Sequence, residues 1–167
     1  MRVPSLFLTV ALAAALPAQG SVLVNDVGLT MDGGMLTVIF GQSCGPFTCT
    51  PFFASPVATG QPSRSVIVYG ATNQPFALAI DLVNPGPCIA FPGIANSLIL
   101  GVQPVTLAFG LIGPGILIGP CNQGRAWYGL SFPSAAPSGV QFQLQALAMS
   151  AAQNVPAFTI ALHSSIQ

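Results

Sequence analysis

Hydrophobic and polar residues alternate along much of this chain, most clearly in residues 139–149, G-V-Q-F-Q-L-Q-A-L-A-M. From Val140 to Gln145 every second side chain is apolar and every other one is Gln. This period of two is typical of a strand with one apolar and one polar face. A helix is the competing interpretation, because Gln, Leu, Ala and Met favour helices. The strict alternation favours a half-buried strand with its glutamine face outward.

Other short segments follow the same plan and are separated by turns rich in Gly and Pro. In residues 75–82 the pattern directs Phe76 and Leu82 inward and Asp81 outward. In residues 157–163 it directs Phe158 inward and His163 outward. The remaining expected strands are 21–24, 27–31, 35–40, 65–69, 97–100, 105–109, 115–118 and 125–132, with a hairpin turn at Asp32-Gly33-Gly34. About ten short strands predict an all-β fold, an antiparallel two-sheet β-sandwich or jelly roll.

Residues 1–18 have the three regions of a secretory signal peptide. Arg2 supplies the positive charge, Leu6–Leu16 the apolar region, and Leu16-Pro17-Ala18 a cleavage site before Gln19. A retained membrane anchor is the alternative interpretation. We therefore expect a protein that is secreted to the outside or to the cell surface, with residues 19–167 forming a single β-sandwich domain.

Charged residues are almost absent. Only 4% of the 167 residues are charged, and the formal net charge is zero, whereas about 25% is usual in soluble domains. Nucleic acids and anionic lipids are bound by clustered Lys and Arg, so this composition argues against both partners. The longest stretch without Pro or Gly in residues 89–120 is Ile94–Leu100. A spanning helix needs about 20 residues, so we expect no transmembrane span in the mature chain.

Four cysteines, Cys44, Cys49, Cys88 and Cys121, follow the expected signal. An even number in an exported chain indicates disulfides. Three pairings are open, and we favour Cys44–Cys49 with Cys88–Cys121, because the first loop is local and Gly-Pro precedes both later cysteines. A zinc site is the rival interpretation, but the spacing of the cysteines does not fit zinc-binding motifs.

The segment Arg125–Phe132 carries the candidate ligand-binding residues. Alternation assigns Ala126, Tyr128, Leu130 and Phe132 to the core, which leaves Arg125 and Trp127 together on the other face. Trp127 can stack on a sugar ring or on the guanidinium of Arg125, and Tyr69 from a nearby strand can join them. The alternative is that Trp127 itself is buried, since two-sheet domains readily bury large aromatic side chains.

Residues suited to catalysis or metal binding are scarce. His163 is the single histidine, and neither a G-x-S-x-G nor an H-E-x-x-H sequence occurs, so we expect no catalytic residues, no cofactor and no enzyme activity. A hydrolase would have to bring two of three isolated aspartates across one cleft. Calcium at Asp26 and Asp32 is the least improbable metal, but both fit turn and loop roles better. We therefore predict no metal site.

The neutral surface gives the main functional hypothesis. β-proteins usually protect their edge strands with charged side chains, and charge also limits association between molecules. A chain that lacks both protections is expected to form homo-oligomers or polymers. We predict a non-enzymatic structural or interaction module that self-associates through neutral strand edges and the glutamine face. The alternative is a carbohydrate-binding module that holds an extracellular polysaccharide on Trp127, Arg125 and Tyr69.

Several strand motifs in the last hundred residues resemble an uncharacterised β-rich domain found near the C-termini of secreted bacterial proteins. They are Q-P-F-A-L-A-I-D-L, S-L-I-L-G, V-T-L-A-F-G, G-P-C, V-Q-F-Q-L-Q-A-L-A-M and F-T-I-A-L-H-S-S. The resemblance covers about residues 65–166. Members often carry an acidic turn after the Gln-bearing strand, where this chain has Ser150-Ala151-Ala152. The resemblance implies an exported β-sandwich and supplies no catalytic residues.

Overall fold

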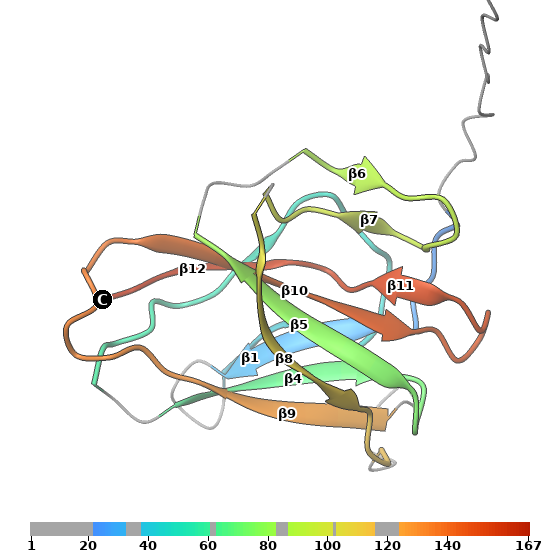
Figure 1. Ribbon diagram of the computed structural model, residues 1–167, viewed down its shortest axis with the longest axis horizontal. Coiled ribbons are helices and arrows are strands. Elements are labelled where there is room, and N and C mark those ends of the chain that lie inside the picture. The colour runs from blue at the N-terminus through green and yellow to red at the C-terminus, as the bar shows by residue number, and fades with distance from the viewer. Residues whose placement is uncertain (1–21, 33–37, 61–62, 83–86, 102, 116–123) are drawn as a thin grey trace, which may run out of the picture.

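The computed structural model describes residues 22–32, 38–60, 63–82, 87–101, 103–115 and 124–167. The expected signal peptide, the turn at Gly33-Gly34, Cys121 and most of the expected strand 115–118 lie outside these residues. Within them the chain forms twelve strands, rather than about ten, and no helix long and apolar enough to cross a membrane. The strands are β1 (Gly28–Asp32), β2 (Ile39–Gln42), β3 (Phe52–Phe53), β4 (Arg64–Gly70), β5 (Pro75–Asp81), β6 (Ile89–Ala90), β7 (Ser97–Leu98), β8 (Val105–Leu111), β9 (Gly124–Leu130), β10 (Gln141–Met149), β11 (Pro156–Phe158) and β12 (Leu162–Ser165) (Figure 1).

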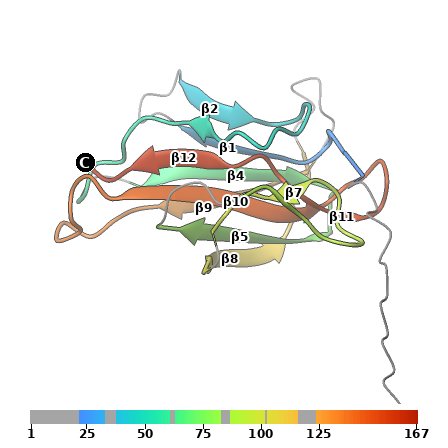
Figure 2. The same cartoon turned by 90° about the horizontal axis from the view of Figure 1, so that it is seen from above.

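The strands form two larger sheets and one separate pair. The first sheet has the order β2-β1-β4-β9, and the second has the order β3-β12-β10-β5-β8, with β11 also paired to β10. β6 pairs with β7. Every pair of these strands is antiparallel except β12 with β3. β2 is an end strand of the first sheet and β8 is an end strand of the second, and the two strands lie at opposite sides of the molecule (Figure 2). The all-β, mainly antiparallel prediction is confirmed.

Apolar side chains from both larger sheets are buried in one cluster. Leu29 and Val68 come from the first sheet, and Leu78, Phe142 and Leu144 come from the second. Burial of each such side chain contributes about 1.5–3 kcal/mol to folding. The apolar positions of the β10 alternation therefore face the core, as predicted.

The other side of β10 is also buried, so the prediction of an exposed glutamine face is wrong for Gln143 and Gln145. They are 0% and 2% exposed. The segment that contains β7 covers Gln145, whose side-chain oxygen accepts from the backbone N–H of Ile99 (2.8 Å) and whose nitrogen donates to the carbonyl of Ser97 (2.9 Å). The same nitrogen also donates to the carbonyl of Thr159 (2.8 Å), between β11 and β12. Alternation separates the two faces of a strand but does not reveal whether another segment covers the polar one.

The C-terminal segment expected as one strand is divided into β11 and β12. The Oγ1 of Thr159 accepts from the backbone N–H of Ala146 (3.0 Å), in a position that a backbone carbonyl would otherwise take. The regular ladder is interrupted there, and Phe158 lies opposite Leu147 on the outer side of the second sheet, with its ring 6.0 Å from that of Phe91. The inward direction expected for Phe158 is therefore wrong.

Two further expectations fail at the ends of strands. Residues 22–24 form no strand; the backbone N–H of Val24 instead donates to the side chain of Asn96 (3.0 Å). Leu82, expected to point inward, follows the last residue of β5 and is 60% exposed. Both segments leave the regular backbone ladder, so the period of two no longer fixes the direction of their side chains.

The disulfide connectivity also differs from the favoured one. Cys49 is bonded to Cys88, which excludes the Cys44–Cys49 and Cys88–Cys121 pairs. The chain passes from β2 in the first sheet to β3 in the second between residues 42 and 52, so Cys44 and Cys49 lie at different ends of a crossing rather than in a closed local loop. Cys44 is disulfide-bonded as well.

Candidate functional site

The surface predicted from sequence lies on the outer side of the first sheet, on its end strand β9. Ala126, Tyr128 and Leu130 contribute to the core, as expected. Trp127 is 60% exposed, and the guanidinium carbon of Arg125 lies 5.3 Å from the centre of the Trp127 ring. The interpretation that buries Trp127 is therefore wrong. The two side chains form a cation–π pair on an open surface.

Tyr69 belongs to the same face. It lies directly opposite Arg125 in the β4–β9 register, and directly opposed residues project to the same side of a sheet. The hydroxyl of Thr30 donates to the phenol oxygen of Tyr69 (3.4 Å). The face thus presents an indole ring, a cation and a phenol, groups that can stack on a sugar or a planar group and hydrogen-bond to it.

The two aspartates considered for calcium have structural partners. Asp26 accepts hydrogen bonds from the hydroxyl of Ser150 (2.7 Å) and the backbone N–H of Ala152 (2.8 Å), so it supplies a carboxylate to the turn after β10. Asp32 accepts from the backbone N–H of Ser65 (2.8 Å). In the described part of the chain, no three His, Cys, Asp or Glu side chains are grouped closely enough to hold a metal ion.

A row of polar side chains that sequence reasoning missed crosses the second sheet. Gln143 on β10 lies directly opposite Asp81 on β5 and His163 on β12, and all three are buried. Alternation assigned each of them to the outer face, and they do share that face. Their position in one row depends on the strand order, and their burial depends on the covering segments, so the only signal in the sequence was three polar residues at outward positions.

The centre of this polar row has unpaired atoms. Both amide atoms of Gln143 and Nδ1 of His163 are buried without a hydrogen-bond partner among the described residues. The His163 ring packs edge-on against Phe53, with ring centres 5.2 Å apart. Burial lowers the pKa of His163 from its usual value of 6.5, because the imidazolium loses hydration. His163 is therefore mainly neutral at pH 7.

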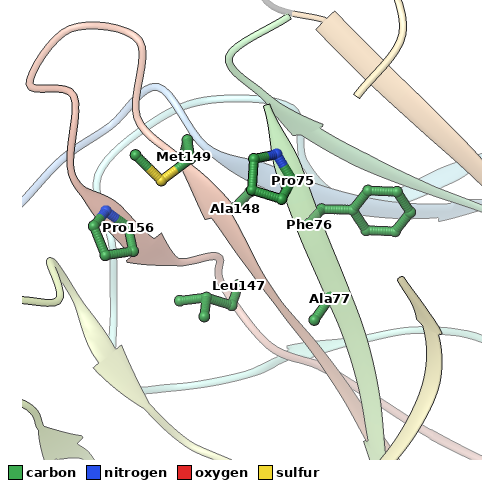
Figure 3. Close-up of a pocket in the computed structure, with 7 residues that line it drawn as sticks. All are labelled: Pro75, Phe76, Ala77, Leu147, Ala148, Met149 and Pro156. Carbon is green, nitrogen blue, oxygen red and sulfur yellow. The ribbon is translucent and has the colours of Figure 1, made fainter. Parts of the chain in front are cut away.

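An apolar pocket of about 210 Å³ lies on the same outer face, farther along β5 and β10 (Figure 3). Its lining side chains are all apolar: Pro75, Phe76, Ala77, Leu147, Ala148, Met149 and Pro156. Phe109 on β8 lies opposite Ala77 and is 84% exposed, and Leu111 lies opposite Pro75 and is 68% exposed. The pocket and these two side chains make one continuous neutral surface. Sequence reasoning placed Phe109 in a strand but could not show that this strand ends the sheet.

Comparisons with known proteins returned no match to any family model, curated protein or solved structure.

Proposed function

We propose that this protein is a secreted, non-enzymatic structural or interaction module that self-associates outside the cell or at its surface. The two larger sheets, whose inner side chains share one core, are interpreted as a β-sandwich formed by residues 19–167. Export is supported by the signal-like pattern of residues 1–18 and by the Cys49–Cys88 disulfide, because disulfides persist in oxidising compartments.

The observation that carries this proposal is the exposed apolar side of β8. β8 is the end strand of the second sheet in the described part of the chain, and it reads V-T-L-A-F-G-L, without charge or proline. Phe109 and Leu111 lie opposite Ala77 and Pro75 on the outer face, and they are 84% and 68% exposed. We call these two side chains the β8 surface. Long, apolar, uncharged edge strands favour association with other chains.

The buried glutamines change the expected route of association. Since Gln143 and Gln145 are covered, the glutamine face is withdrawn as a contact surface, and the β8 surface takes its place. Charge that would oppose contact between two copies is scarce, because the whole chain has three Arg and three Asp. Neutral surfaces approach each other without like-charge repulsion.

A pair of charge insertions tests the proposal. Phe109→Lys places a charge in the β8 surface and should weaken self-association by tenfold or more in sedimentation velocity, since a buried unpaired charge is costly. Leu82→Lys is the matched control: Leu82 is also exposed but lies outside every strand, so it should have little effect. Equal association of wild type and both variants would contradict the use of β8.

The exposed Arg125–Trp127 pair favours a second candidate function, binding of an extracellular polysaccharide. Stacking on an aromatic ring is a usual way to hold sugars, and Trp127 is exposed enough to take part. Under this hypothesis wild-type protein is retained on a polysaccharide column and Trp127→Ala is not. A wild-type protein that passes through columns of neutral and acidic polysaccharides without delay would eliminate the candidate.

A further inference from the structure

We infer that the apolar pocket on the second sheet is the receptor for Phe109 of a second copy of this chain, so that two copies pair face to face. The inference rests on the proposed self-association and gives it a specific geometry. It starts from a protruding ring and an apolar pocket on the same face of one molecule.

The protruding ring is Phe109. It is 84% exposed, and its position opposite Ala77 directs it to the outer face of the sheet. An aromatic side chain exposed to this extent leaves a large apolar area in water, and burial of that area would be favourable. Exposed aromatic anchors of this kind are typical centres of protein interfaces.

The pocket begins on β5, the strand next to β8. Ala77 from β5 and Leu147 from β10 lie directly opposite each other on the outer face, and Met149 and Pro156 pair farther along. All four line the pocket of about 210 Å³. An apolar cavity of about 150 Å³ accepts a benzene molecule, so a phenyl ring fits the pocket. Its small side chain, Ala77, leaves the space that the ring would occupy.

A second copy is the occupant that suits this arrangement. A two-fold axis along the sheet face, midway between Phe109 and the pocket, places each Phe109 over the pocket of the other copy. Such an interface is self-complementary, as in most homodimers. No lining side chain and no residue of β8 is charged, so neither copy brings an unpaired charge into the contact.

Complementation between two variants tests this pairing. Phe109→Ala removes the ring and keeps the pocket, whereas Ala77→Phe fills the pocket and keeps the ring. Each variant alone loses both contacts of the dimer, so its dissociation constant should rise about a hundredfold if each anchor contributes about tenfold. An equimolar mixture regains one contact, and its heterodimer should form about ten times more tightly than either variant alone.

The experiment uses the exported, oxidised protein in sedimentation velocity, with thermal melts to verify that Ala77→Phe folds. Phe53→Ala is the control, because it removes the same ring from another strongly exposed position, on β3, and should leave association unchanged. Phe109→Ala alters only an exposed side chain, so its result remains informative even if Ala77→Phe misfolds.

Loss in both single variants with recovery in the mixture supports the pairing. Association of both variants at the wild-type level overturns the pairing of Phe109 with the pocket. Loss in both variants without recovery in the mixture also overturns this pairing. In either case the proposal of self-association is unaffected. A wild-type chain that stays monomeric at all concentrations overturns the proposed function as well. If that monomeric chain takes up benzene in the pocket, the pocket belongs to a small apolar ligand instead.

Discussion

Gln143 and Gln145 lie two positions apart on the same side of β10, and both are buried. Gln145 makes three hydrogen bonds to backbone groups of neighbouring segments, whereas neither amide atom of Gln143 has a partner in the described residues. A buried polar group without a partner costs about 1–3 kcal/mol. Gln145 therefore fastens neighbouring segments to the second sheet, whereas Gln143 brings an unpaired amide into the interior.

Replacement of each glutamine by Met separates these roles. Gln143→Met should raise the free energy of unfolding by about 1 kcal/mol, because it removes an unpaired amide at similar volume. Gln145→Met should lower it by about 3 kcal/mol, since one N–H and two carbonyls lose their partner. Urea unfolding measures both. Similar destabilisation by the two variants would contradict the assignment.

His163 makes stability depend on pH. Its pKa in the folded protein is lowered from 6.5 by burial, so the unfolded chain binds a proton more readily. Stability is therefore highest above pH 6.5 and falls as the pH drops from 6.5 towards the folded pKa, by at most about 1.4 kcal/mol per pH unit.

Thermal melts between pH 5 and 8 test the role of His163. The wild-type melting temperature should fall below pH 6.5, and His163→Gln should flatten this part of the profile, because its neutral amide does not titrate. A variant that keeps the full wild-type decline would show that another group is responsible.

At the scale of strands, local patterns predicted much of the fold. The core side of β10, the inward Leu78 of β5 and the outward Arg125–Trp127 pair all follow from alternation within one segment. Strand alternation needs no knowledge of the neighbours, because successive side chains point to opposite faces.

Features that join distant segments could not be predicted. The polar row needs β5, β10 and β12 to be adjacent, and the pocket needs β11 beside β10. Gln145 is buried because Ser97 and Ile99 lie over it. The alternation within a single strand contains no information about which strands are its neighbours or which segments cover it.

The Cys49–Cys88 disulfide is testable by mass spectrometry. Peptides from a digest of the oxidised protein should include one that links Cys49 to Cys88. In the chain-entropy description, a bridge over 39 residues contributes about 4 kcal/mol. Replacement of both cysteines by Ser should thus lower the free energy of unfolding by a similar amount. A digest that links Cys44 to Cys49 would contradict the connectivity.

At the scale of the whole molecule, low charge and exposed apolar side chains act together. The apolar pocket and the β8 surface lie on one side of the second sheet, and no residue of either is charged. Association through such a surface is driven by the removal of apolar area from water. Salt screens interactions between charges and does not weaken this contribution. Self-association should therefore persist at high ionic strength, unlike association between charged surfaces.

The most direct test is sedimentation equilibrium of the oxidised wild-type protein across a concentration series, at low and high sodium chloride. The proposal predicts that the average mass rises from monomer to dimer or beyond with concentration, and that salt does not weaken the association. A constant monomer mass at every concentration and at both salt levels would contradict self-association as the function of this protein.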